Sequence, residues 1–367
     1  MNRIHCKQLC NNMFTMVCVS GRISRNSNEF LGGKAMSSKQ QVLALLEQYK
    51  GTYISGEEIA RQMQITRAAV WRTIHDLRLA GHAIEASTKV GYRLSESSDV
   101  LSLQGIRSAF VDASCHELPL YFHESIGSTN TEAKRLALEG TPHGTMVVAG
   151  CQTEGRGRNG RFFFSPNDSG LYVSVVLRPD LGTAMALRIT SGAAVAVCRA
   201  IERVCDRQAG IKWVNDVYID GLKVCGILTE GISGFETGRI ESLVVGIGVN
   251  HTLPPEGFPD DLHGIAGAVF PDSVPPGASR NRLAAAIIEE LLTVVDHVDE
   301  VGFMVEYRRR SVVVGQRVKV LQGTVAYEAE AIGIADDGAL VVRLADGSEQ
   351  QLRAGEISLR PILGSSW

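Results

Sequence analysis

The stretch Gly155-Arg156-Gly157-Arg158-Asn159-Gly160-Arg161, followed at once by Phe162-Phe163-Phe164-Ser165-Pro166, is the most informative part of this chain. Glycines that alternate with arginines let the backbone reach φ values that other residues avoid and approach a bound molecule closely. The arginines supply fixed positive charge and planar donors that match carboxylate and phosphate groups. The aromatic residues offer a flat apolar surface on which a base can stack. The pattern predicts a flexible loop that closes over an anionic, nucleotide-like ligand.

Two common phosphate-binding motifs do not account for this loop. A Walker loop requires Gly-Lys-Ser/Thr at a fixed spacing, and the dinucleotide fingerprint requires a glycine-rich turn between a strand and a helix. The sequence around residues 155–166 meets neither condition. From these residues alone, a solvated basic loop or an RNA-binding arginine-glycine segment remains an alternative.

Length and composition indicate a globular protein of several domains. A chain of 367 residues is long enough for two or three domains, and 44% hydrophobic with 21% charged residues is an ordinary balance. The net charge of -3 predicts no general attraction to nucleic acid, so any such binding requires a local basic patch. No apolar run approaches the ~20 residues of a membrane helix. We therefore expect a soluble, cytoplasmic protein without a membrane partner.

Cysteine usage and the first 35 residues suggest no covalent cross-linking and no export signal. The eight cysteines form no CxxC pair and show no metal-ligand spacing, which predicts reduced, buried thiols. Residues 1–35 contain five basic residues, one acidic residue and a short apolar patch that is thin for a signal peptide. A transit peptide is one interpretation. We favour a disordered or spurious extension, because Met36 is a natural start before a strong helix.

Residues 36–97 predict a winged helix-turn-helix domain. A Ser-x-x-Glu capping box at Ser55 begins a second helix, and Thr66 can cap a third helix that Gly81 ends. The spacing of Val70, Ile74 and Leu77 gives the third helix one apolar face. The expected elements are helices that begin near residues 43, 56 and 67, followed by a hairpin of residues 83–86 and 91–94.

This domain is locally basic, although the whole chain is not. Residues 37–95 contain eight Lys/Arg and five Asp/Glu. Such an excess favours phosphate contacts, and the third helix would place polar side chains in the major groove. The alternative is a small helical interaction module with solvated charges, and for Trp71 packing against the domain is an equal alternative. The candidate DNA-binding residues are Arg67, Trp71, Arg72, His75 and Lys89.

Residues 98–310 show a mixed pattern of strands and helices with polar side chains at strand ends and turns. Thr129 and Glu132 have the spacing of a capping box and predict the start of a helix. Lys212-Trp213-Val214-Asn215-Asp216 places a cation, an amide and a carboxylate within one turn. Loops on a rigid scaffold often carry binding groups, although Asn and Asp also cap turns for local reasons. The residues singled out are Ser128, Thr129, Asn130, Gln152, Asn215, Asp216, Lys223 and Asn250.

Residues 311–367 predict a small all-β domain. Apolar residues alternate with polar ones along several short segments, and Asp336-Asp337-Gly338 and Asp346-Gly347 are turn signals. We expect an SH3-like β-barrel.

Taken together, these motifs resemble the biotin protein ligase family. The motifs are the Gly-Arg loop with its Phe-Ser-Pro, the Lys-Trp-x-Asn-Asp turn, Lys223-Val-Cys-Gly-Ile-Leu, and Gly246-Ile-Gly-Val-Asn250. The preceding winged helix makes the chain similar to the bifunctional type, a ligase and biotin operon repressor in one chain. The resemblance spans about residues 37–364. It implies an α+β multidomain protein: a winged helix, a mixed α/β class II synthetase-like catalytic domain and an SH3-like β-barrel.

The resemblance implies a two-step reaction. Biotin and Mg-ATP would form biotinoyl-5′-AMP, which then acylates a lysine of a biotin carboxyl carrier protein. The bifunctional type would also bind operator DNA as an adenylate-bound homodimer. A ligase whose winged helix does not regulate is one alternative, and a purely regulatory biotin sensor is another. Lys223 and Asp216 argue against the sensor, and the Gly-Arg loop argues against a lipoate ligase.

Site residues follow from the same resemblance. It assigns catalysis to Lys223, Asp216 and Arg158, with Asp216 also the candidate Mg²⁺ ligand. Two departures occur: Asn159 stands where another arginine is common and Val214 where proline is common. The first could alter loop ordering or dimerisation, and the second should slightly loosen the turn. The biotin-binding candidates are Ser128, Thr129, Asn130, Gln152, Arg156, Gly157, Arg158 and Lys223; the ATP-binding candidates are Arg161, Phe163, Asn215, Asn250 and Arg360.

Overall fold

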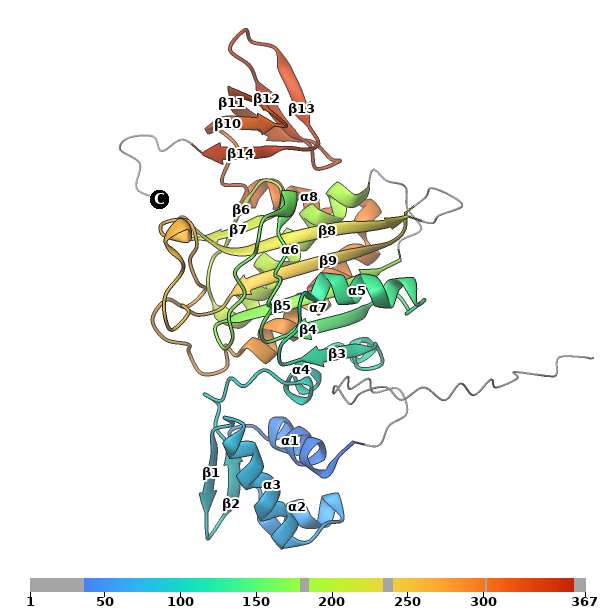
Figure 1. The fold of residues 1–367 in the computed structure, drawn as a ribbon, viewed down its shortest axis with the longest axis vertical. Helices are drawn as coiled ribbons and strands as arrows, with labels where there is room; N and C mark the ends of the chain where they lie inside the picture. The colour runs from blue at the N-terminus through green and yellow to red at the C-terminus, as the bar shows by residue number, and fades with distance from the viewer. Residues whose placement is uncertain (1–35, 179–184, 234–239, 301, 360–367) are drawn as a thin grey trace, which may run out of the picture.

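The computed structural model describes residues 36–178, 185–233, 240–300 and 302–359. The N-terminal segment 1–35 and the ATP-site candidate Arg360 lie outside these residues. Three units follow one another along the long axis: a small helical unit with a hairpin, a large sheet flanked by helices, and a second sheet at the C-terminal end (Figure 1).

The N-terminal unit has the predicted helix-turn-helix and wing. Ser55 Oγ accepts from the Glu58 amide at 3.0 Å and Thr66 Oγ1 accepts from the Ala69 amide at 3.1 Å, so both residues cap their helices. The second half of the predicted capping box is absent, because the Glu58 carboxylate accepts from Arg61 and Gln62. The apolar face of the third helix is buried in a hydrophobic core that belongs to the N-terminal unit alone. The elements are α1 (Ser38–Gln48), α2 (Gly56–Met63), α3 (Arg67–Leu79), β1 (Ile84–Ser87) and β2 (Gly91–Leu94).

A buried histidine makes this unit sensitive to acid. The His82 side chain is buried, and its Nδ1 has no hydrogen-bond partner in the described parts of the chain. Burial, helped by the charges of Lys39 and Lys50, lowers the pKa of His82 to about 4. In the unfolded chain the pKa returns to about 6.5, so the unfolded state binds the proton first.

We therefore expect the winged unit to lose stability as the pH falls from about 6.5 towards 4, and not above that window. The measurement is the thermal midpoint of the winged unit, followed by tryptophan fluorescence, at several pH values. His82→Leu removes the titrating group and should flatten this dependence. A variant that keeps the wild-type slope would contradict the assignment.

The central unit is a seven-stranded mixed sheet in the order β3-β4-β5-β9-β8-β7-β6. β3 and β4 are parallel, and all the other pairs are antiparallel. Valines alternate between its two faces: Val147 and Val244 pack under α5, whereas Val148 and Val245 belong to the core that includes α6 and α7. The strands are β3 (Leu120–His123), β4 (Thr145–Ala149), β5 (Gly170–Leu177), β6 (Gly210–Lys212), β7 (Asp216–Ile219), β8 (Leu222–Ser233) and β9 (Ile240–Asn250); the helices are α4 (Leu103–Ala109), α5 (Thr129–Leu138), α6 (Met185–Cys205), α7 (Arg280–Asp296) and α8 (Gly302–Arg310).

An ion pair joins the segment after the wing to the central unit. Arg280, the first residue of α7, is almost fully buried. Its backbone N–H and Nε donate to the Asp99 carboxylate at 2.6 and 2.8 Å, and a terminal guanidinium nitrogen donates to the Asp99 carbonyl oxygen. Asp99 is therefore the counter-ion that makes burial of Arg280 tolerable.

The C-terminal unit is an antiparallel five-stranded sheet in the order β13-β12-β11-β10-β14. The predicted turns are present, with Gly338 and Gly347 at φ +86° and +85°. Trp213 Nε1 donates to the Gly338 carbonyl oxygen at 2.9 Å and so links this sheet to the central one. The strands are β10 (Arg317–Gln322), β11 (Val325–Ile334), β12 (Leu340–Arg343), β13 (Glu349–Leu352) and β14 (Glu356–Leu359).

The cysteines within the described ranges are free, as predicted. Burial raises the pKa of Cys115 to about 11 and that of Cys198 to about 12, so both remain protonated thiols at neutral pH. Cys6, Cys10 and Cys18 lie outside the described residues. Across the same ranges, no helix combines the length and apolar character that crossing a bilayer requires.

Candidate functional site

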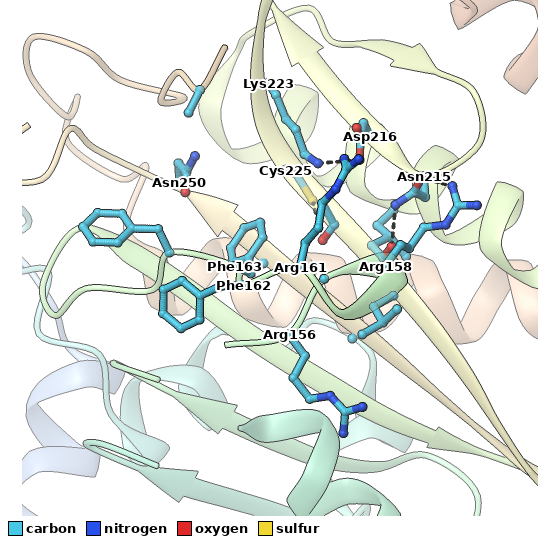
Figure 2. Close-up of a pocket in the computed structure, with 18 of the residues that line it drawn as sticks. Arg156, Arg158, Arg161, Phe162, Phe163, Asn215, Asp216, Lys223, Cys225 and Asn250 are labelled. Atoms are coloured by element: carbon cyan, nitrogen blue, oxygen red, sulfur yellow. Dashed lines mark hydrogen bonds and ion pairs between the residues drawn. The ribbon is translucent and has the colours of Figure 1, made fainter. Parts of the chain in front are cut away.

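One cavity of about 400 Å³ gathers the predicted ligand-binding side chains. It lies at the ends of β7, β8 and β9, beneath the Gly-Arg loop and beside β14 (Figure 2). All the biotin-site and ATP-site candidates except Arg360 line it. They are Ser128, Thr129, Asn130, Gln152, Arg156, Gly157, Arg158, Arg161, Phe163, Asn215, Asp216, Lys223 and Asn250.

The Gly-Arg loop is folded as a short hairpin. The Gly157 amide donates to the Arg161 carbonyl oxygen at 2.8 Å, and the Phe163 amide donates to the Gly155 carbonyl oxygen at 3.0 Å. A Cβ at position 155 would lie only 2.1 Å from the Phe163 carbonyl oxygen, so this hairpin requires glycine there. Asn159 occupies the left-handed region at φ 56°, which asparagine tolerates better than most residues.

Contacts with the C-terminal sheet hold this hairpin over the cavity. Arg158 donates to Asn215 Oδ1 and to the Gly355 carbonyl oxygen, both at 3.0 Å. Asn159 Nδ2 and an Arg161 guanidinium nitrogen donate to the two oxygens of Glu356 at 2.8 and 2.6 Å. The departure at position 159 therefore supplies a neutral partner for Glu356.

A charged cluster occupies the end of the cavity formed by β7 and β8. Lys223 Nζ lies 2.7 Å from Asp216 Oδ1, and both side chains are partly exposed to the cavity. Lys212 lies close by, and burial lowers its pKa, although the charge of Asp216 opposes the shift. Lys212, Lys223, Arg158 and Arg161 outnumber the Asp216 and Glu356 carboxylates here, so this end favours anionic ligands.

A chain of hydrogen bonds forms what we call the polar floor, made of Thr129, Asn130, Gln152 and Ser174. Gln152 Oε1 accepts from Thr129 N and Oγ1 at 2.9 and 3.1 Å. Ser174 Oγ lies 2.8 Å from Thr129 Oγ1 and 2.6 Å from Asn130 Oδ1. Ser128 Oγ is buried and has no partner in the described parts, so it is available to a ligand.

The predicted capping box at Thr129 is wrong. Ser128 precedes the first residue of α5 without a side-chain cap, and Thr129 is already helical. Glu132 pairs with Arg135 instead of closing back on the helix start. The Thr129 side chain is hydrogen-bonded to Gln152 and Ser174 in the polar floor. It therefore does not cap the helix.

Arg156 lies apart from the other cations. Its guanidinium is 3.4 Å from Glu230 Oε1 and points away from Lys223 (Figure 2). Glu230 also accepts from Lys134 Nζ and from Asn130 Nδ2 at 2.9 Å. Arg156 and Arg158 thus line the same cavity but have different partners, Glu230 for Arg156 and Asn215 for Arg158. Glu230 and Lys134, which the sequence did not single out, contact residues of the cavity wall without lining the cavity themselves.

Aromatic and loop residues shape the remaining wall. The Phe163 ring lies against Gly248, where a Cβ would come within 2.5 Å of the ring, and packs edge-to-face on Tyr172. Asn250 Nδ2 donates to the Gly267 carbonyl oxygen at 3.0 Å, so its amide secures the loop that follows β9. Asn250 borders the cavity, but its side-chain amide group is hydrogen-bonded to the backbone of Gly267.

The cavity offers a magnesium ion a carboxylate ligand but no cluster of protein ligands among the described residues. The described residues contain no cluster of three or more His, Cys, Asp or Glu side chains that could enclose a metal. Mg²⁺ is commonly bound by one or two carboxylates together with substrate phosphates and water. Asp216 can provide one such oxygen.

The candidate DNA-binding residues form an exposed surface on α3 and the wing. Arg67, Arg72, His75 and Lys89 are exposed, and Trp71 is 61% exposed. The Trp71 and His75 rings stack with centroids 5.7 Å apart. Trp71 therefore lies mostly outside the domain core, in contact with His75.

Three family models match the chain in order. They are an HTH domain over residues 38–93, the Biotin/lipoate A/B protein ligase family over 122–250, and the Biotin protein ligase C terminal domain over 313–360. The chain is 33% identical to the bifunctional ligase/repressor BirA of Bacillus subtilis over 84% of this chain and 95% of that protein. It is 28% identical to the protein of the same name from Escherichia coli, over 87% and 96% of the two chains. The biotin protein ligase of Aquifex aeolicus, solved with biotin and ATP, superposes with a TM-score of 0.54 at 25% identity, covering 66% of this chain and 98% of that one.

Proposed function

The chain belongs to the biotin protein ligase family in its bifunctional, DNA-binding form, and from this membership we propose that it activates biotin with ATP and transfers it to a carrier-protein lysine. The observation that carries the proposal is the convergence of Lys223, Asp216, Arg158 and the polar floor on one cavity. A sensor without catalysis would have no need of that charged end.

In the first step, a biotin carboxylate oxygen attacks the α-phosphorus of ATP, and the bond to pyrophosphate breaks. Two anions must approach each other, so cations already in place lower the barrier more than mobile ones would. We assign this role to Lys223 and Arg158, which border the same cavity. Lys223 binds the carboxylate oxygens, and Arg158 closes over the phosphate.

In the second step, the amine of the carrier lysine attacks the mixed anhydride carbonyl, and AMP leaves. The attacking amine must lose a proton, and Asp216 is the carboxylate at this end of the cavity. We assign to Asp216 the acceptance of that proton. When bound, Mg²⁺ would neutralise phosphate charge, with Asp216 as its candidate protein ligand.

The polar and apolar walls of the cavity bind different parts of the two substrates. We place the biotin ring on the polar floor with Ser128, because hydroxyl and amide groups there can pair with a ureido group. We place adenine towards Phe163, with Asn215 and Arg161 at the nucleotide and Asn250 holding its loop. Arg156 and Gly157 border the biotin end.

The same proposal covers domain limits and fold details. We assign residues 36–97 to a winged helix, 98–310 to a class II synthetase-like catalytic domain and 311–367 to an SH3-like barrel. The antiparallel order of the five C-terminal strands supports the last assignment.

The direct test uses ATP, Mg²⁺, biotin and a biotin carboxyl carrier domain. Biotin should appear on one carrier lysine by mass spectrometry, and pyrophosphate should form only when biotin is present. No transfer at saturating substrates, with biotin still bound, would favour the regulatory sensor.

We also propose that the adenylate-bound protein dimerises and binds operator DNA. The support is the exposed basic surface of α3 and the wing. DNA binding that depends on biotin and ATP distinguishes this repressor from a ligase without regulation. Sedimentation with and without the adenylate tests the dimer.

Two single substitutions should separate base reading from phosphate contact. Arg72→Ala on α3 should cost about 1–3 kcal/mol on the preferred site and relax its specificity. Lys89→Ala at the wing tip should weaken binding to all sequences and lower the slope of log affinity against log salt by about 1. Fluorescence anisotropy over a salt series measures both. Equal effects of the two variants on every sequence would contradict the assignment.

A further inference from the structure

The chain passes from the winged unit to the central unit through a short segment, residues 95–100. Leu94, the last residue of β2, is fully buried in the core of the winged unit. Leu101 and Leu103 are already buried in the core of the central unit. The contacts of the segment between these two cores therefore decide how freely the winged unit can turn.

The winged unit holds this segment as far as Ser98. The Ser98 carbonyl oxygen accepts from Lys50 Nζ at 2.8 Å, and Ser98 Oγ accepts from the Ala83 amide at 3.2 Å. The Ser98 amide donates to the Ser95 carbonyl oxygen at 3.0 Å, which closes the segment into a turn. Ser98 is only 4% exposed, so water has little access to these hydrogen bonds.

The central unit holds the segment from Asp99 onwards. The Asp99 carboxylate and carbonyl oxygen both accept from the buried Arg280. The Val100 carbonyl oxygen accepts from Asn281 Nδ2 at 2.9 Å, and the Ser102 amide donates to Asn281 Oδ1 at 3.0 Å. Asn281 is buried and, like Arg280, lies in the first turn of α7. Asp99 is therefore fixed to a helix of the catalytic core.

We call Ser98 and Asp99 the joint, because these two neighbouring residues are held by different units. Only two soft dihedral angles lie between them, ψ of Ser98 and φ of Asp99. Beside the joint, α1 lies next to α4, but residues of both helices border a groove of about 830 Å³ (Figure 1). Packing across this boundary is therefore incomplete, and much of the restraint on the winged unit comes from the joint.

We propose that the joint fixes the orientation of α3 relative to the catalytic unit and so determines which spacing of DNA half-sites this chain accepts. The inference rests on the proposed repressor function, in which two chains bind one operator. Each added base pair moves a half-site by about 3.4 Å and turns it by about 35° around the duplex. Winged units fixed to a dimer match one separation of the half-sites, whereas flexibly tethered ones accept several.

An insertion of Gly-Ser-Gly between Ser98 and Asp99 tests the proposal. It keeps the hydrogen bonds on both sides of the joint and makes their connection flexible. The measurement is the affinity of the adenylate-bound protein for operators whose half-sites are moved in steps of one base pair. Wild type should lose about tenfold or more in affinity when the preferred separation changes by two base pairs. The insertion variant should bind the same two operators within about threefold of each other.

The same insertion after Gly323, in the exposed turn between β10 and β11, is the matched control and should keep the wild-type profile. Biotin-dependent exchange between pyrophosphate and ATP shows that the catalytic unit of each variant is folded. A sharp spacing profile that survives the insertion at the joint would overturn the inference and leave the repressor proposal intact. Equal binding of all spacings by wild type would have the same meaning. Failure of adenylate-bound wild type to bind any operator would instead overturn the repressor proposal.

Nuclear magnetic relaxation tests the joint without DNA. In wild type, the backbone amides of α1, α2 and α3 should tumble with the rotational correlation time of the whole chain, and the insertion at the joint should shorten it. Independent tumbling of the winged unit in wild type would contradict the proposal.

Lys50→Met provides a point variant that does not lengthen the chain. It removes the hydrogen bond to the Ser98 carbonyl oxygen and keeps most of the side-chain length. The spacing profile should broaden, although less than with the insertion. The lost charge weakens binding to all operators alike, so the ratio between two spacings reports the joint alone. A ratio equal to that of wild type would count against the role of Ser98.

Discussion

Lys223→Ala is expected to abolish adenylate formation, with pyrophosphate release reduced about 10²–10³-fold or more. Lys223 is the cation at the charged end of the cavity, 2.7 Å from Asp216. Its removal takes away the charge that offsets repulsion between carboxylate and phosphate. It also leaves the Asp216 carboxylate without its ion-pair partner, beside the two anions that must react.

Isotope exchange between pyrophosphate and ATP measures this step without the carrier protein. Lys223→Arg keeps the positive charge but replaces the compact ammonium with a planar guanidinium. Exchange that is faster than in Lys223→Ala but slower than in wild type would show that the charge itself contributes. Lys319→Ala, an exposed lysine on β10, should behave as wild type. Exchange near the wild-type rate in Lys223→Ala would remove Lys223 from catalysis.

Arg158→Gly is expected to release the adenylate before transfer. Arg158 ties the Gly-Arg loop both to Asn215 and to the Gly355 carbonyl oxygen. Its loss removes the hydrogen bond to Asn215 and leaves Asn159 and Arg161, through Glu356, to hold the loop on the C-terminal sheet. The added glycine also increases the conformational freedom of the loop. Free biotinoyl-AMP would acylate exposed lysines on unrelated proteins.

The measurement is biotin incorporated into serum albumin mixed with the enzyme and its carrier domain. Albumin labelling should increase about tenfold or more over wild type, in line with the loss of two charge-assisted hydrogen bonds. Arg309→Gly, an exposed arginine of α8, should leave albumin unlabelled. If labelling in Arg158→Gly stays confined to the carrier, the loop does not retain the adenylate.

The winged helix was predictable because its signals are local. Ser55 and Thr66 cap helices within three residues of themselves, and the periodic apolar face of α3 needs no distant partner to be recognised. The C-terminal turns were predictable for the same reason, since Gly338 and Gly347 adopt positive φ angles. Short-range chemistry of this kind is written directly in the sequence.

The side-chain directions within the site were not predictable in the same way. Arg156 and Arg158 alternate with glycine, yet only Arg158 reaches towards Asn215, because Arg156 meets Glu230, which is distant in sequence. The helix α5 begins at Thr129 as predicted, but the predicted capping box is absent, because the partners of the Thr129 side chain come from other parts of the chain. The residues that line the cavity could be predicted from the family resemblance. Their hydrogen-bond partners could be identified only from the folded structure.

The Asp99–Arg280 pair has a consequence for how such proteins can be shortened in evolution. Asp99 lies two residues beyond the proposed limit of the winged helix, so a truncation that removes residue 99 as well would strand the buried Arg280 guanidinium without its counter-ion. Breaking a buried pair in this way costs about 3–5 kcal/mol, a large part of the stability of an ordinary domain. A shortened catalytic unit must therefore retain Asp99 or replace Arg280. The N-terminal module can be cut away without this loss of stability only if the cut falls before the aspartate.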